Sequence, residues 1–213
     1  MLGIDKCKRP IFLKRYHDEL IAAKESQESS EDLLNSYENL SENSKELYRL
    51  PINLAILSWI WSKDKIRAKS INSSASLYGA IIEILNEKLL SRLHDSPYVA
   101  KKSNKQIKVS IKYFEKQLCI EALAALKNDR MYIDDNDVKR LMDACKDIQL
   151  PFDELAGSFL LTKLDHSNNL EESLEVGHKA FLDYFSAMRI MSLLISCSNN
   201  INTIFDAKCL IGY

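Results

Sequence analysis

Apolar residues recur every three or four positions along most of the chain. In residues 75–93 the repeating positions are Leu77, Ile81, Ile84, Leu85, Leu89 and Leu93. This period places them on one face of an amphipathic helix. Comparable patterns predict helices over residues 10–25, 30–40, 42–50, 107–126 and 135–145, and a shorter helix that opens at Pro151. Helices therefore dominate the expected structure.

Residues 51–61 form the most apolar of these segments. The segment begins with Pro51, a residue that suits the first turn of a helix. Its eleven residues are too few to cross a bilayer, which takes about 20. We expect a helix that belongs to the core.

The pattern changes towards the C-terminal end. Residues 158–164 and 172–177 are short strand candidates on either side of a polar loop. A stripe at helical spacing follows, formed by Phe181, Tyr184, Phe185, Met188, Met191 and Ile195. Three helices followed by a β-hairpin is the order of elements in a winged helix, so we expect that fold in the second part of the chain.

A polar segment, HDSPYVAKKSNKQ at residues 94–106, interrupts the helical period and contains Pro97 and several lysines. Such a segment is typical of a linker, and it predicts a domain border near residue 98. The expected fold class is mainly α. A small helical domain over residues 1–97 precedes a winged-helix domain with one β-hairpin wing over residues 98–200, and residues 201–213 begin a following segment.

Composition excludes several classes of protein. The chain has 213 residues, of which 46% are hydrophobic, and a formal net charge of −1. No apolar run approaches the length of a membrane span, and the N-terminus lacks the apolar core of a signal peptide. The five cysteines are scattered, which favours buried free thiols in a reducing compartment. We therefore expect a cytoplasmic protein without a membrane span.

The sequence offers no catalytic constellation. The five glycines stand at positions 3, 79, 157, 177 and 212, too far apart for a P-loop or a dinucleotide-binding loop. Neither a C-x-x-C nor an H-E-x-x-H pattern occurs, so no metal site is expected. Ser158 lacks the second glycine of a nucleophile elbow. The acidic run of residues 134–137 favours helix capping over calcium binding, because it lacks the glycine and distal glutamate of a calcium loop.

Charge also argues against binding of nucleic acid. The third helix of the expected winged helix carries Asp153 and Glu154, and residues 148–162 contain no Lys or Arg. These carboxylates would be repelled by phosphates. A basic stretch lies over residues 101–116, but a solvated linker and helix face account for it. We expect no nucleic-acid partner.

His178 is the candidate for a ligand contact. It follows Gly177 and precedes the helix of the aromatic stripe. A half-buried histidine that bonds a nearby carbonyl is one interpretation. The other is a donor to an anion such as phosphate, because the N-terminus of a helix collects unpaired N–H groups and partial positive charge. Spacing alone does not choose between these interpretations.

Two motifs resemble NACHT-type signal-transduction ATPases, the STAND class that includes NOD-like receptors. GHKAFLDYFSAMRI is similar to the end of their winged helix, with matches at His178, Phe181, Asp183, Tyr184, Phe185, Ser186 and Ala187. LPINLAILSWIW is similar to the proline-led helix of their helical domain 1, with matches at Pro51, Leu54 and Leu57. Val176, Asp183 and Leu50 depart mildly from the usual residues. The resemblance covers residues 35–197.

The resemblance implies a regulatory, non-catalytic portion of such a protein, which closes over ADP bound to a P-loop ATPase core. Pro51 would then pack near the adenine, and His178 would contact the β-phosphate of ADP. ADP or ATP would bind only together with the core, and exchange for ATP would release the winged helix and permit oligomerisation in innate immune or stress signalling. Two alternatives stay open: a free-standing helical and winged-helix adaptor that binds another protein, and, less favoured, a winged helix that binds nucleic acid.

Overall fold

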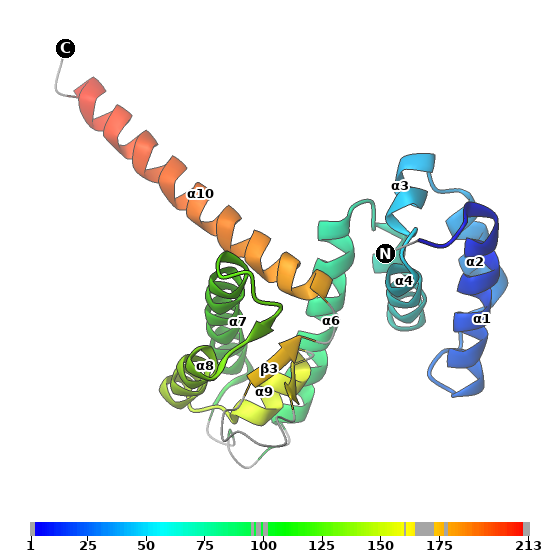
Figure 1. The fold of residues 1–213 in the computed structure, drawn as a ribbon, viewed down its shortest axis with the longest axis horizontal. Coiled ribbons are helices and arrows are strands. Elements are labelled where there is room, and N and C mark those ends of the chain that lie inside the picture. Colours follow the sequence, from blue (N-terminus) through cyan, green and yellow to red (C-terminus); the bar gives the residue numbers. More distant parts are fainter. Residues whose placement is uncertain are drawn as a thin grey trace. The chain divides into compact units, whose positions relative to one another are not determined.

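The computed structural model describes residues 3–94, 96, 99, 102–159, 161–164, 173–176 and 179–210; side-chain environments are described outside residues 160–178 and 199–210. The chain is mainly helical, as predicted, and divides into two compact units, Met1–Leu85 and Asn86–Tyr213 (Figure 1). This division lies inside the helix α6 (Ser74–His94). Residue 98 itself lies outside the described residues, so the expected domain border near it stays a prediction.

The first unit contains six helices before α6 among the described residues. They are η1 (Lys6–Lys8), α1 (Arg9–Ala22), α2 (Ser30–Glu38), α3 (Glu42–Leu47), α4 (Pro51–Lys63) and α5 (Lys65–Lys69). The helix α4 packs against α1 and α5. Its buried side chains are Asn53, Leu54, Ile56, Leu57, Ser58, Ile60 and Trp61. The prediction of a core helix at this position is confirmed.

A buried histidine joins three segments of the first unit. His17, in α1, is fully buried, and its Nε2 lies 3.0 Å from the backbone oxygen of Glu28. A carbonyl only accepts hydrogen bonds, so Nε2 carries the proton and donates it. Nδ1 is then an acceptor for the hydroxyl of Ser58, in α4, at 3.1 Å. This pairing ties α1 and α4 to the connector that precedes α2.

The second unit combines helices with a small antiparallel sheet. After α6 its elements are α7 (Asn104–Lys127), β1 (Tyr132–Ile133), α8 (Asp135–Ile148), α9 (Phe152–Ser158), β2 (Leu161–Leu164), β3 (Ser173–Val176) and α10 (Lys179–Leu210). The strand order is β1-β3-β2, with Leu174 of β3 opposite Ile133 on one side and Lys163 on the other. The two predicted strands are therefore present and pair with each other, but they are shorter than expected. The strand β1 and the helix α5 were not predicted.

Aromatic side chains hold the core of the second unit together. Phe114 of α7 lies 5.6 Å from Phe159, and Phe159 lies 6.1 Å from Phe185 of α10, measured between ring centroids. All three rings are buried. Tilted and edge-on pairs of this kind stabilise a core beyond the apolar area that they bury. They fix α7, the end of α9 and the start of α10 against one another.

The helix α10 runs past α7 and continues beyond it (Figure 1). The helix extends to Leu210 and passes through the expected domain border at residue 200, so that border stays a prediction. Residues 211–213 lie outside the described residues.

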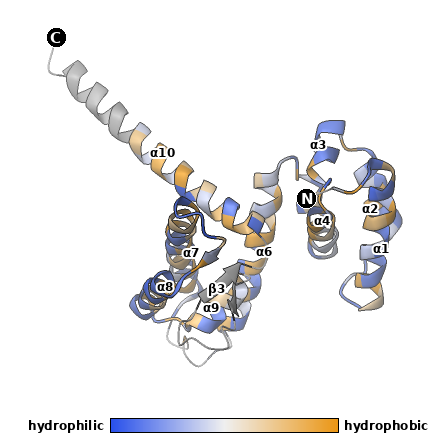
Figure 2. Ribbon diagram, in the orientation of Figure 1, coloured by the Kyte–Doolittle hydropathy of each residue, from blue (hydrophilic) through white to orange (hydrophobic). Residues whose placement is uncertain are grey.

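The predicted stripe of α10 is buried only at its start. Phe181 and Phe185 are buried, whereas Met188, Met191 and Ile195 are exposed. The stripe therefore belongs to the core at its start and to the surface of the described structure farther along. Apolar residues are nevertheless dense along this part of α10 (Figure 2).

One segment of α10, Lys179–Ser198, is long and apolar enough to cross a membrane by length and composition, with a mean hydropathy of 1.3. No such run was expected from the sequence. Length and composition alone do not distinguish a span from a helix that protein covers.

Candidate functional site

Pro51, the first candidate site residue, lies at the start of α4. It occupies the first helical position, and its side chain is exposed. Leu50 precedes it in an extended conformation, and no side chain caps this end of the helix. Proline is favoured here because its fixed φ suits the helix and its missing N–H has no helical partner to lose. The ring is therefore rigid and open to contact.

A hydrogen-bond network lies close to Pro51 in the sequence, at the buried side chain of Asn53. The side chain of Asn53 is buried, and its Nδ2 donates to the backbone oxygen of Leu47 at 2.6 Å. The hydroxyl of Tyr78, in α6, donates to Asn53 Oδ1 at 2.9 Å. A buried amide whose nitrogen and oxygen both have hydrogen-bond partners restricts the backbone around it. It connects the end of α3, the start of α4 and α6 within the first unit.

His178, the second candidate, lies outside the described residues, as does Gly177. The elements that flank it are described. The strand β3 ends at Val176, in the middle of the sheet, and α10 begins at Lys179. Phe181 and Phe185 anchor the first turns of α10 in the core. The prediction that His178 contacts a phosphate stays a prediction, and so does a joint role with Pro51.

A buried ionic cluster in the second unit was not predicted. Glu121 of α7 and Asp137 of α8 are both buried, and Arg140 donates to Glu121 through Nη2 at 2.8 Å and Nε at 3.0 Å. Arg140 also pairs with Asp137, and Arg130 Nη1 lies 2.7 Å from an Asp137 carboxylate oxygen. These carboxylates raise the pKa of both guanidinium groups, although burial opposes the rise. Each buried negative charge is thereby matched.

The same cluster confirms the predicted helix cap. Asp134 is the N-cap of α8, and its side chain accepts from the backbone N–H of Asp137 while Asp137 accepts from that of Asp134. This reciprocal arrangement is a capping box, with Asp137 in the position usually filled by Glu or Gln. Within the described ranges no group of three His, Cys, Asp or Glu side chains is placed to hold a metal ion.

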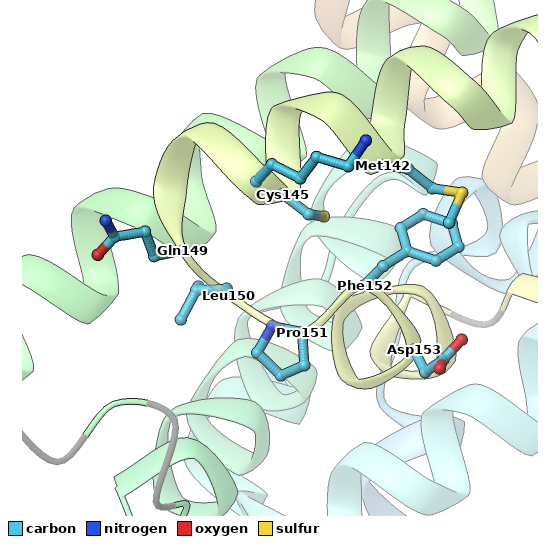
Figure 3. Close-up of a pocket in the computed structure, with 8 residues that line it drawn as sticks. Met142, Cys145, Gln149, Leu150, Pro151, Phe152 and Asp153 are labelled. Atoms are coloured by element: carbon cyan, nitrogen blue, oxygen red, sulfur yellow. The ribbon is translucent and has the colours of Figure 1, made fainter.

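A pocket of about 530 Å³ lies at the turn between α8 and α9 (Figure 3). Its lining residues are Met142, Cys145, Lys146, Gln149, Leu150, Pro151, Phe152 and Asp153. Burial raises the pKa of the Cys145 thiol to about 12. The thiolate is the reactive form of cysteine, so this thiol is inert near neutral pH. The pocket is mainly apolar, and the Cys145 thiol in it is not an activated nucleophile.

The charged side chains of α9 and α7 determine how well the second unit could bind nucleic acid. Asp153 and Glu154 are exposed on α9, where Glu154 lies 3.6 Å from Arg92. On α7, Lys112 pairs with Glu115 at 2.9 Å, so part of the basic stretch is neutralised locally. Lys101 lies outside the described residues. The exposed face of α9 is acidic, as the sequence indicated.

Comparison with known protein families, with curated proteins and with solved structures gives no match to this chain.

Proposed function

We propose that the chain is the helical-domain and winged-helix portion of a NACHT-type, nucleotide-switched signalling protein of the cytoplasm. In this proposal it hydrolyses nothing. It closes over ADP held by a P-loop ATPase core of the same protein, and it opens when ATP replaces ADP. The β2–β3 hairpin after α7, α8 and α9 is then the wing of the winged helix.

The observation that carries the proposal is the order of elements around the two motifs. The proline-led helix α4 is followed by α6 with Tyr78, by the long helix α7, by the hairpin and by α10 with its aromatic start. Pro51 supports an adenine contact, because its ring is exposed at the first position of α4. The exposed acidic face of α9 favours this proposal over a nucleic-acid-binding winged helix.

In physical terms the proposed switch is a shift of population. ADP favours a closed state only through contacts that are lost when the protein opens. Pro51 and His178 are the two residues assigned to such contacts, at the adenine and at the β-phosphate. A histidine donor to a phosphate is a hydrogen bond to a charged group, and removal of one weakens binding by about 10- to 100-fold.

The test is nucleotide analysis of the full polypeptide that carries this chain. Purified protein is denatured, and the released nucleotide is quantified by chromatography. We expect about one ADP per chain in the natural protein. We expect His178→Ala to lose most of this ADP and to raise the basal content of oligomer, because the closed state loses a contact.

Lys179→Ala is the matched control, since Lys179 is the exposed next residue and begins α10. It should retain ADP as the natural protein does. Equal ADP retention in the His178→Ala protein, absence of bound nucleotide, or an upstream coding region without a glycine-rich phosphate loop would each overturn the proposal.

An adaptor without nucleotide is the alternative function. The exposed apolar side chains of α10 favour it, because large exposed apolar patches mark protein contacts. In that case His178→Ala would be silent and no ADP would be found.

A further inference from the structure

The apolar residues of α10 lie on one side of the helix at its start and on another side farther along. Residues advance by ~100° around a helix axis. Phe181, Leu182 and Phe185 are buried and lie on the side of α10 that faces its own unit. After residue 187 that same side carries the polar residues Arg189, Ser192 and Ser196, with Leu193 at its edge. The helix therefore turns a polar strip towards α7 where it leaves the core.

The opposite side of the helix carries the apolar residues in this second part. We define the α10 apolar face as Ile190, Met191, Leu194 and Ile195. These side chains are 46%, 54%, 58% and 56% exposed, respectively. The centre of this face lies about 180° from the centre of the buried side formed by Phe181, Leu182 and Phe185. The face is therefore not an extension of the core that the described residues of this unit form.

A lipid bilayer fits this face poorly. Beyond residue 187 the apolar run of α10 is short, because it is interrupted by Ser198, Asn199, Asn200, Asn202 and Thr203, whereas a span takes about 20 predominantly apolar residues. The rest of the apolar segment, residues 179–187, includes side chains already buried in protein. The sequence has no Lys or Arg between Arg189 and Lys208, whereas helices that lie on membranes use such residues to contact anionic headgroups.

A second copy of the chain fits better. The sequence carries no charged residue from Ile190 to Phe205. Two identical faces can meet only where they do not repel each other, and a face without charge meets that condition. Arg189, the nearest charge, lies on the opposite side of the helix.

The exposed area suits a weak dimer. The four side chains of the α10 apolar face expose on the order of 400 Å², about half of the roughly 800 Å² per partner in standard interfaces. A two-fold pairing buries the same patch on both copies.

We propose that the α10 apolar face pairs with the same face of a second copy of this chain, so that the protein dimerises through α10. The pairing needs no nucleotide and stands apart from the function proposed above. It gives α10 the cover that a helix with so wide an apolar surface requires in water.

The test is analytical ultracentrifugation of the purified chain over a range of concentrations. The monomer mass is 24.4 kDa, and we expect a concentration-dependent shift to twice that mass in the micromolar range. The Leu194→Glu variant places a charge at the centre of the face in both copies. We expect it to weaken dimerisation at least 100-fold.

Ser196→Glu is the matched control. It adds the same charge two residues away, but on the polar side of the helix, where the Ser196 hydroxyl donates to the backbone oxygen of Ser192. It should dimerise like the natural chain, and circular dichroism should show all three proteins folded.

Four results would overturn the proposal. They are a monomer at every concentration, equal effects of Leu194→Glu and Ser196→Glu, a spread of masses without a defined dimer, and binding of the natural chain to phosphatidylcholine–phosphatidylglycerol vesicles that Leu194→Glu abolishes. The last result would assign the face to a lipid surface.

Discussion

The helices α4 and α10 are both strongly apolar, yet only α4 is covered over its length. Other helices of the first unit pack around α4, and its buried polar side chains Asn53 and Ser58 both have hydrogen-bond partners. In α10 the first turns are buried and the next three are exposed. Apolar composition thus shows that a helix needs cover, but it does not show whether the same unit supplies that cover.

The largest expected effect is the difference between two leucines, one in each helix. Leu54, in α4, is fully buried, whereas Leu194, in α10, is more than half exposed. Leu54→Ala leaves a cavity in the core and should lower the free energy of unfolding by about 2–5 kcal/mol. Leu194→Ala should change it by less than about 0.5 kcal/mol in the monomer. Urea denaturation at low protein concentration measures both.

The comparison fails if the two variants lose similar stability. A large loss for Leu194→Ala in the monomer would mean that the chain's own unit covers this part of α10. A repeat of the measurement at high protein concentration, where the proposed dimer forms, should increase the effect of Leu194→Ala and leave that of Leu54→Ala unchanged.

A matched pair of serines gives the next largest effect. The Ser58 hydroxyl donates to His17 Nδ1 in the core, and Ser58→Ala leaves that nitrogen buried without a partner, which costs about 1–3 kcal/mol. The Ser196 hydroxyl bonds a carbonyl of its own helix at 2.9 Å and is exposed. Ser196→Ala should therefore change stability by no more than about 0.5 kcal/mol. Thermal unfolding of the two variants checks this, and an equal loss would show that the His17 pairing contributes nothing.

The sequence predicts most helices well, because their signals are local. The start of α4 follows from Pro51, and the start of α8 from the capping residues Asp134 and Asp137. Each signal depends on residues within one turn of the helix end. The core role of α4 follows from its unbroken apolar run. The sequence does not predict the short elements α5 and β1, because segments of five and two residues carry too little periodicity to be recognised.

Features that depend on distant residues escape prediction as well. Glu121 and Arg140 are 19 positions apart, and no spacing rule brings them together. The periodicity of α10 identifies an apolar stripe, but the burial of Phe185 and the exposure of Met191 depend on where α7 ends relative to α10. In the candidate site, the position of Pro51 at the start of a helix follows from the local sequence. Its role in nucleotide binding stays a prediction.

The smallest expected effect is a difference in reactivity between the buried and the exposed cysteines. Cys119 and Cys145 are buried, and burial raises the pKa of each thiol to about 12. Because a thiolate is the form that reacts, neither should react with maleimide in the native protein near pH 7.5. Cys7 and Cys197 are exposed and should react.

Protein concentration then distinguishes Cys7 from Cys197. Cys197 lies one turn after Leu194, next to the α10 apolar face, whereas Cys7 lies in η1. If the face pairs with a second copy, labelling of Cys197 should slow by a few-fold as protein concentration rises, because the partner shields the thiol, and labelling of Cys7 should not change. Peptide mapping by mass spectrometry distinguishes the two sites. Equal rates for Cys197 at all concentrations, in a protein that forms a dimer, would place the dimer contact away from this face, and α10 would then differ from α4 in lacking any cover.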